Sequence, residues 1–246
     1  MTRNMKRNYV WILASLMFSG LLGLASISVL MIAILSTSAW AGTLKDNFNS
    51  GNMNSWDSSG APQDTWAVKN GELVVTPDGY PVGFSIGETT WKDYTILVRA
   101  KIVKFQPSGA IEGANIAARC ASFPMYGYVF GFGMLSDSNK YIFCFRSEGN
   151  IMVSIAVFKP FEWELDKWYD LKLTAEGDQF KFYVNDELVI EYTDTAYPAG
   201  KVGIGASFST TTAHFDDFSV TGNDVFAPVE AKGKLATSWG KIKSNQ

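Results

Sequence analysis

The sequence has very few of the residues from which metal sites and nucleophilic active sites are commonly built. It contains one histidine, His214, and two cysteines, Cys120 and Cys144, among 246 residues. A zinc site made of several histidines is therefore excluded, and two separated cysteines do not replace them.

Positive charge is also scarce. Beyond residue 41 the chain carries 18 Lys and Arg against 24 Asp and Glu, a net charge of -6. No basic patch suits a phosphate backbone, so nucleic acid is not an expected partner. A disulfide framework is not expected either. If residues 115–158 form consecutive antiparallel strands, a middle strand separates Cys120 from Cys144 by about 9.5 Å, beyond disulfide reach. We expect two free, buried thiols.

Residues 1–41 have the composition of an export signal. Three basic residues precede an apolar run from Val10 to Leu35, and Ala39 and Ala41 fit the small-residue rule for signal peptidase. The run is also long enough to span a bilayer, so an uncleaved N-terminal anchor stays open. In both cases we expect the rest of the chain to be periplasmic, cell-surface or secreted, with no membrane contact beyond this leader.

The region after the leader alternates short apolar runs with turn residues, and no segment shows sustained helical periodicity. This pattern predicts an all-β sandwich or barrel over residues 42–222. Asn185-Asp186 predicts a hairpin between Phe180–Val184 and Glu187–Tyr192, since both residues tolerate positive φ. Turn residues also divide residues 115–158 into a four-strand antiparallel meander.

Residues 223–246 form a C-terminal tail of different character. Leu235, Trp239 and Ile242 follow the spacing of a short amphipathic helix. Two interpretations stay open: the tail packs on the domain or frays, or it docks to a protein partner.

Three stretches resemble a known superfamily: LKDNFNSGNMNSWDSSG followed by TWAVKNGELVV, then KWYDLKLTAEGDQFKFYVNDELVIEY, then AGKVGIGASFSTTTAHFDDFSV. Together they resemble the concanavalin A-like lectin/glucanase superfamily, and within it the laminin-G-like jelly rolls and the bacterial 3-keto-disaccharide hydrolase domains. The resemblance implies a jelly-roll β-sandwich of two antiparallel sheets, one of them concave. Such folds host lectins, glycoside hydrolases, lyases and adhesive modules, so the fold alone does not select a function.

The stretch AHFDDFSV places two aspartates inside a strand. Successive strand side chains point to opposite faces, so Phe215 and Phe218 can share one core only if the strand bulges at Asp216 and Asp217. The resemblance implies that the first and last strands lie side by side, which would bring Asp46 close. Calcium favours clustered oxygen ligands, so these three aspartates are the candidate structural calcium site. Alternatively, one aspartate accepts backbone N–H groups and the other is solvated.

One row of carboxylates is spaced for catalysis. In FEWELD, Glu162, Glu164 and Asp166 would share one strand face, with neighbours about 6.5 to 7 Å apart, a spacing compatible with sugar hydrolysis. The order differs from the Glu-x-Asp-x-x-Glu strand of family-16 glycoside hydrolases. Pro160 also favours a solvated loop here.

Ligand binding has better candidates. Arg119 and Tyr128 match positions where laminin-G-like jelly rolls often show Arg and Tyr, and the expected register pairs Tyr128 with Arg146 and Cys120. Sugars stack on aromatic rings and bind fixed polar groups, so Arg119, Tyr128 and Arg146 are candidate ligand residues, with Trp163 as an exposed platform. The alternative is that these side chains belong to the core.

These observations favour an exported, non-catalytic carbohydrate-binding or adhesion module whose partner is a glycan or polysaccharide. The first alternative is a glycan-cleaving enzyme, a glycoside hydrolase or lyase of the 3-keto-disaccharide hydrolase type. The second is a structural surface protein that docks through its C-terminal tail.

Overall fold

The computed structural model describes residues 41–225, apart from 59–60, 106–110, 122–125, 135–138, 150, 208–210 and the side chains of 151–156. The leader and the tail helix predicted above lie outside the described residues. Within the described part the structure is almost entirely β, with one 3₁₀ turn, η1 (Gln63–Thr65). No helix there is long and apolar enough to cross a membrane.

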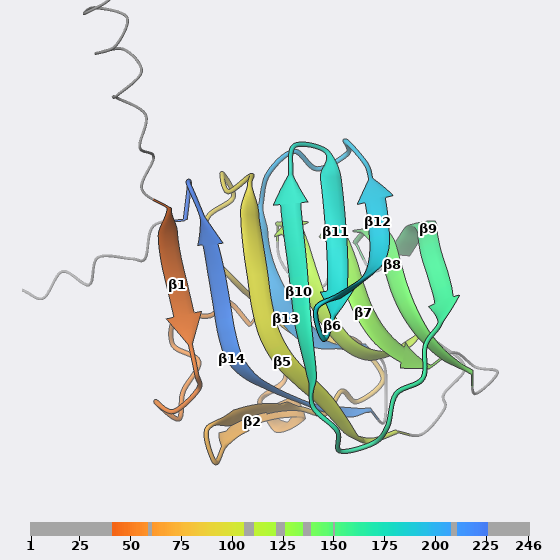
Figure 1. Cartoon of the computed structure of the whole chain (residues 1–246). Helices are drawn as coiled ribbons and strands as arrows, with labels where there is room; N and C mark the ends of the chain where they lie inside the picture. Colours follow the sequence, from red (N-terminus) through yellow and green to blue (C-terminus); the bar gives the residue numbers. More distant parts are fainter. Residues whose placement is uncertain are drawn as a thin grey trace, which may run out of the picture. The chain divides into compact units, whose positions relative to one another are not determined.

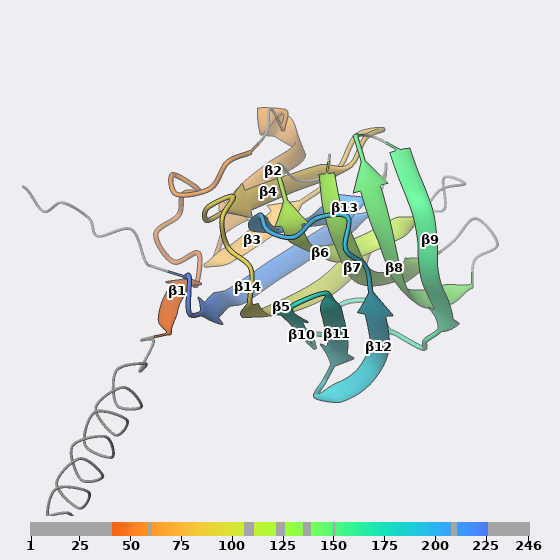
Figure 2. The same ribbon diagram turned by 90° about the horizontal axis from the view of Figure 1, so that it is seen from above.

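The strands form two antiparallel sheets, which confirms the predicted jelly-roll sandwich (Figures 1 and 2). The eight-stranded sheet runs in the order β12 (Glu187–Thr193), β11 (Gln179–Val184), β10 (Tyr169–Glu176), β5 (Tyr94–Lys104), β14 (Thr212–Gly222), β3 (Glu72–Val75) and β2 (Trp66–Lys69), with β1 (Gly42–Asp46) also paired to β14. The six-stranded sheet runs in the order β4 (Val82–Ile86), β13 (Lys201–Ser207), β6 (Glu112–Cys120), β7 (Tyr126–Met134), β8 (Lys140–Glu148) and β9 (Ile151–Pro160).

Turn residues fix two hairpins, of which the one at Asn185 and Asp186 was predicted from the sequence. Asn185 and Asp186 have φ values of 51° and 65° and join β11 to β12. Asn70 and Gly71, with φ of 55° and 79°, do the same between β2 and β3. Positive φ at both central residues matches the right-handed twist of the strands, so these turns favour the observed pairing.

The bulge predicted in AHFDDFSV is present. The register of β14 against β5 shifts between Asp216 and Ser219, and Asp217 has a φ of 51°. As a result both Phe215 and Phe218 are buried, at 0% and 1% exposure. The first and last strands also lie side by side, as expected, because all of β1 pairs with residues 218–222 of β14 (Figure 1).

The meander β6 to β9 is confirmed, with one difference in register. Tyr128 lies across from Arg146 as predicted, but its partner on β6 is Ala118 and not Cys120. The chain bends at Arg119, whose φ is 49°, and the pairing of β6 with β7 ends before it. Up to Ala118, a slip of two residues keeps each side chain on its predicted face, because the side-chain period of a strand is two. Beyond the bend at Arg119 the faces are reversed, so Cys120 packs with Ala117 and Val129 on the outer face and not beside Tyr128.

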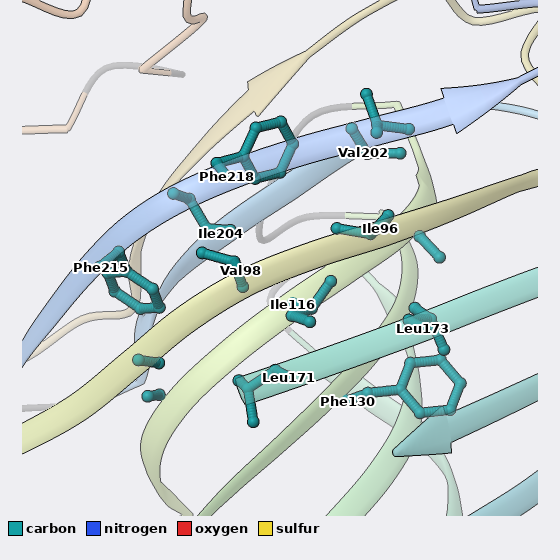
Figure 3. Close-up of a cluster of buried hydrophobic side chains, with 14 of the residues drawn as sticks. Ile96, Val98, Ile116, Phe130, Leu171, Leu173, Val202, Ile204, Phe215 and Phe218 are labelled. Atoms are coloured by element: carbon teal, nitrogen blue, oxygen red, sulfur yellow. The ribbon is translucent and has the colours of Figure 1, made fainter. Parts of the chain in front are cut away.

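The core lies between the two sheets. Figure 3 shows side chains from β5, β10 and β14 packed against others from β6, β7 and β13, including Ile96, Leu171, Ile116 and Phe130. Each of these is at most 1% exposed. Burying a side chain of this size stabilises the fold by about 1.5–3 kcal/mol, so this contact between sheets dominates the stability of the domain.

Part of the outer face of the six-stranded sheet is buried too. All nine residues of β6 are buried, and a second cluster of Ala117, Cys120, Val129 and Phe143 packs on the side opposite the main core. A side chain at Gly131 would meet the Ala114 carbonyl and the Asn115 amide. The room left by this glycine is therefore used for close packing inside the protein.

Both cysteines are free and buried, as the sequence predicted. Burial raises the pKa of the Cys120 thiol to about 12 and raises that of Cys144 further. Because the thiolate is the reactive form, these thiols are packing residues and not nucleophiles.

Candidate functional site

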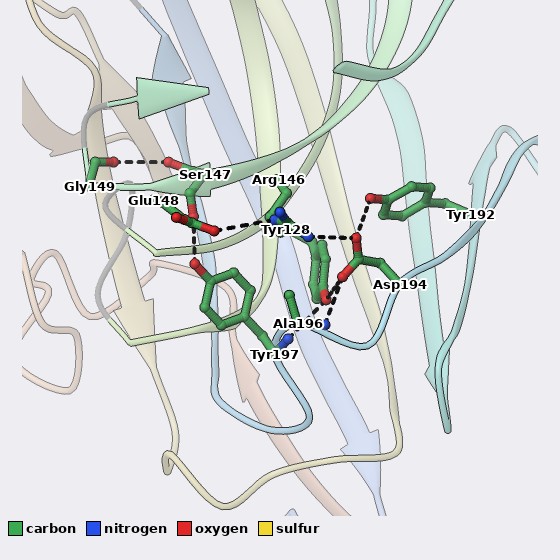
Figure 4. A network of polar contacts seen from close by, with 9 residues as sticks. All are labelled: Tyr128, Arg146, Ser147, Glu148, Gly149, Tyr192, Asp194, Ala196 and Tyr197. Carbon is green, nitrogen blue, oxygen red and sulfur yellow. Dashed lines mark hydrogen bonds and ion pairs between the residues drawn. The ribbon is translucent and has the colours of Figure 1, made fainter. Parts of the chain in front are cut away.

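A carboxylate that the sequence analysis did not single out, Asp194, is the centre of the main polar cluster (Figure 4). Its Oδ1 accepts hydrogen bonds from the Tyr128 hydroxyl at 2.7 Å and the Ala196 N–H at 2.7 Å. Its Oδ2 accepts from Arg146 Nη1 at 2.9 Å and from the Tyr192 hydroxyl at 2.9 Å. Four donors thus occupy the acceptor positions of one carboxylate.

We call Tyr128, Arg146, Tyr192, Asp194 and Tyr197 the Asp194 cluster. Tyr128 comes from β7 and Arg146 from β8, directly across from it. Tyr192 is near the end of β12 in the other sheet, and Asp194 and Tyr197 lie in the segment that leads to β13. The cluster therefore joins the ends of the two sheets.

Tyr197 makes further hydrogen bonds within the cluster and to β8. Its N–H donates to the Tyr128 hydroxyl at 3.0 Å, and its own hydroxyl donates to the Ser147 carbonyl at 3.1 Å. Its ring lies edge-on to Tyr128, with centroids 5.5 Å apart. Two hydrogen bonds and a ring contact fix this tyrosine, so the cluster is formed before any ligand arrives.

The cluster lowers the pKa of Asp194 and raises the pKa values of Tyr128 and Tyr197. Burial alone would raise the pKa of Asp194, but hydrogen bonds from Ala196, Tyr128 and Tyr192 and the charge of Arg146 outweigh it, so the pKa is lowered. Burial is the largest cause that raises the pKa of Tyr128, and the neighbouring carboxylate adds to it. Burial likewise raises the pKa of Tyr197.

The outer edge of the cluster reaches solvent. The Arg146 side chain is 24% exposed, and its Nε lies 3.5 Å from a Glu148 carboxylate oxygen that belongs to a 47% exposed side chain. Tyr126 pairs across the strands with Glu148 and is 45% exposed. An aromatic ring, a guanidinium and a carboxylate therefore lie together at the end of β7 and β8.

Arg119 lies near this cluster but faces inward. It is 2% exposed, and its guanidinium donates to the backbone carbonyls of Tyr197, at 3.2 Å, and of Lys92 and Gly177. The guanidinium also lies 4.9 Å from the centre of the Phe180 ring. Through these hydrogen bonds Arg119 holds together three chain segments, those at Lys92, Gly177 and Tyr197.

Trp163 does not form an exposed platform, and that prediction was wrong. Its side chain is 1% exposed, and its Nε1 donates to the Gly133 carbonyl at 2.8 Å. The ring contacts Phe105 and Phe132 at centroid distances of 6.0 and 5.9 Å. A tryptophan in a loop gains more from burying its ring with its N–H satisfied than from exposure.

The carboxylates of FEWELD lie in a loop after β9, as Pro160 indicated. Glu162, Glu164 and Asp166 have side chains that are 93%, 71% and 73% exposed. A hydrogen bond from Lys167 is the largest cause that lowers the pKa of Glu164. A general acid needs the opposite shift, so nothing in this geometry favours catalysis by the row.

Asp46 lies beside the β14 bulge, across from Phe218. Its Oδ1 accepts the Phe48 N–H at 2.8 Å and its Oδ2 accepts Trp56 Nε1 at 2.8 Å. Both oxygens of this carboxylate therefore already hold the chain segment that follows β1.

The other two predicted calcium ligands make separate contacts. The Asp217 N–H donates to Asp216 Oδ1 at 2.7 Å, and Asp217 Oδ2 pairs with Arg99 at 3.5 Å. Between 41 and 225, in the parts that the structure describes, no group of three His, Cys, Asp or Glu side chains could hold a metal ion. The calcium site stays a prediction.

Fold and cluster together define a concanavalin A-like jelly roll with a polar cluster between the ends of its sheets. Residues 43–221 match the model of the 3-keto-alpha-glucoside-1,2-lyase-like domain, which is most of the chain, and the protein belongs to this family.

Solved structures share the fold. The carbohydrate-binding module CBM66 from Bacillus subtilis has a TM-score of 0.53 at 23% identity, over 70% of this chain and 98% of that one. The catalytic domain of an endo-1,3-beta-glucanase from Thermotoga petrophila RKU-1 has a TM-score of 0.52 at 12% identity, over 73% and 96%. The Ca²⁺/Man-bound VIP36 exoplasmic/lumenal domain has a TM-score of 0.54 at 12% identity, over 80% and 93%. Binding modules and enzymes thus share this architecture.

One curated relative is a levanase of Bacillus subtilis (strain 168). It is 35% identical over 78 residues, which is 32% of this chain and 11% of the levanase. The chain therefore spans only a small part of that enzyme's length, and its activity does not transfer to this protein by the match alone.

Proposed function

We propose that the protein is an exported, non-catalytic carbohydrate-binding domain that takes a glycan at the solvent-facing edge of the Asp194 cluster. The observation that carries this proposal is the position of Arg146. Asp194 holds its guanidinium at 2.9 Å, and the side chain is still 24% exposed. The 45% exposed Tyr126 ring lies on the neighbouring strand.

Sugar chemistry fits these groups. The apolar C–H face of a pyranose or furanose ring packs on a tyrosine ring, while hydroxyl groups accept from a guanidinium and donate to a carboxylate. Tyr126, Arg146 and Glu148 offer these three partners side by side. Because Asp194 already fixes Arg146 before a ligand binds, binding costs little conformational entropy of this side chain.

The cluster supports binding better than turnover. Four donors occupy Asp194, its pKa is lowered, and Tyr128 is kept neutral, so none of these groups is suited to act as a general base near neutral pH. A glycan-cleaving enzyme is the second candidate, favoured by the description of the matched family. Turnover of every glycan that binds should therefore be assayed in parallel.

A glycan array with the full chain tests the proposal, run with millimolar calcium and again with chelator, with thermal melting in both. We expect binding of a glycan, at least a tenfold loss in Arg146→Ala, and no change in the matched control Lys181→Ala, whose side chain lies on β11 beside Glu191. Silence across the array would contradict the proposal and favour a structural protein that docks through its tail.

The same experiment separates the two remaining predictions. Melting that rises with calcium, and no longer does so in Asp217→Asn, would place calcium at Asp46, Asp216 and Asp217, because a ligand selective for the folded state stabilises it. Product release from a bound glycan would identify an enzyme, and Glu164→Gln would then test the FEWELD row.

A further inference from the structure

A pocket lies at the β2 edge of the eight-stranded sheet, whereas the Asp194 cluster lies at the β12 edge. It has a volume of about 350 Å³ and lies between edge strand β2 and the segment 51–58. Its lining side chains are uncharged, and they combine amides with tryptophans: Asn52, Asn54 and Gln63 with Trp56 and Trp66. This combination differs from the Asp194 cluster, which contains a guanidinium and a carboxylate.

The segment that forms one wall is fixed by its own hydrogen bonds. The Asn54 N–H donates to Asn52 Oδ1 at 3.1 Å, and Asn52 Nδ2 donates to the Ser50 carbonyl at 3.2 Å. Trp56, which is 7% exposed, is held through its Nε1 by Asp46 at 2.8 Å. The wall is therefore formed without a ligand.

The second tryptophan lacks such a partner. Trp66 Nε1 is buried and has no hydrogen-bond partner among the residues that the structure describes, although the ring packs edge-on against Phe84 at 5.2 Å. A buried donor without an acceptor costs about 1–3 kcal/mol. Because protein atoms cover this Nε1, a ligand in the pocket contacts the ring of Trp66 and not its N–H.

We infer that this pocket is a second binding site, for a neutral oligosaccharide. Amide side chains both donate to and accept from sugar hydroxyls, and indole faces pack on sugar C–H groups. The absence of charge from the lining disfavours uronic acids and sulfated sugars, because nothing there compensates the desolvation of an anion.

The position of the pocket has a consequence for how a glycan is held. Strands β2 and β12 are the two edges of a path of seven strands, so six spacings separate them, about 29 Å along the sheet. The Asp194 cluster lies at the end of β12. Two weak sites at this separation hold a polysaccharide surface more tightly than either site alone.

The test follows the indole N–H signals of the ¹⁵N-labelled protein by NMR, with a fructo-oligosaccharide and a gluco-oligosaccharide of about six units as probes, up to about 10 mM. Trp66→Phe assigns the Trp66 signal. We expect a saturable shift of this signal with one probe, no shift with an oligogalacturonate, and little shift of Trp163, whose N–H is bonded to Gly133 at 2.8 Å.

Variants keep this inference separate from the proposed function. In Arg146→Ala the Trp66 shift should persist, while Gln63→Ala with Asn54→Ala should weaken it about fivefold. The inference is overturned if neither neutral probe moves the Trp66 signal, if the oligogalacturonate moves it equally, or if Arg146→Ala abolishes the shift. Binding at the Asp194 cluster alone would leave the proposed function standing and this second site refuted.

Discussion

The outer faces of the two sheets differ in how far their central strands β5 and β6 are buried. On β5 of the eight-stranded sheet, buried residues alternate with solvent-facing ones such as Leu97, which is 44% exposed. On β6 of the six-stranded sheet, every residue is buried. In a strand with one solvent-exposed face, alternation of polar and apolar residues shows which face is buried. A strand buried on both faces lacks this alternation. The solvent-facing residues of the proposed glycan site at the Asp194 cluster lie at the end of β7 and β8, where these strands reach water.

This difference between the two sheets would be refuted if a side chain on the outer face of the six-stranded sheet could be truncated without loss of stability. Phe143 lies on this face and is 1% exposed. We expect Phe143→Ala to lower the free energy of unfolding by about 3–5 kcal/mol, because it leaves a cavity. Leu97→Ala, on the outer face of the other sheet, should change it by less than about 1 kcal/mol. Urea unfolding of both variants measures the difference, and equal losses would refute it.

The junction between the sheets should also be sensitive. Asp194→Asn removes a carboxylate with four donors and replaces one oxygen by an NH₂ group, so we expect a loss of about 2–3 kcal/mol at neutral pH. The exposed carboxylate of Asp170, whose side chain is 74% exposed, provides the matched control Asp170→Asn, with little expected loss.

The pH dependence of this loss has a definite sign. Hydrogen bonds and Arg146 lower the pKa of Asp194 against the effect of burial. The stability that depends on the carboxylate is therefore present above its unfolded pKa, about 4, and is lost as the pH falls through the lower folded value. The difference between Asp194→Asn and wild type should shrink below about pH 4 in thermal melts. A difference independent of pH would refute the charge-based explanation.

The smallest effect is expected at the β14 bulge. Burial is the largest cause that raises the pKa of Asp216, and the charge of Asp217 adds to it. Stability linked to the protonated form is therefore lost as the pH rises through the raised folded pKa. Asp216→Asn keeps the acceptor for the Asp217 N–H, so at pH 7 we expect no loss, or a gain below about 1 kcal/mol. A clear loss only in the presence of calcium would instead identify Asp216 as a metal ligand.

Much of the fold could be predicted from residues that are neighbours in the sequence. Asn185 and Asp186 set a hairpin, and the adjacent Asp216 and Asp217 required a bulge, because both effects depend on residues that are neighbours in sequence. The register of β6 was missed by two residues since it depends on the positive φ of Arg119, which is not a residue type that signals a turn.

The site was less predictable. Tyr128 and Arg146 were identified as candidates, but Asp194, which joins them, lies 66 and 48 residues away in sequence. The one local signal was the segment TDTAYP, in which an aspartate caps the N–H two residues later, a common turn motif. Trp163 was misjudged because loop position does not reveal whether a ring turns inward.

The pairing of β1 with β14 has a further consequence for how the domain can be built into larger proteins. Gly42 and Gly222 are directly opposite partners at the end of this strand pair. The two ends of the domain therefore lie next to each other, held together by the pairing of β1 with β14. A domain with adjacent ends can be inserted into a surface loop of a host protein, or circularly permuted by a short joining peptide, without stretching the rest of its fold.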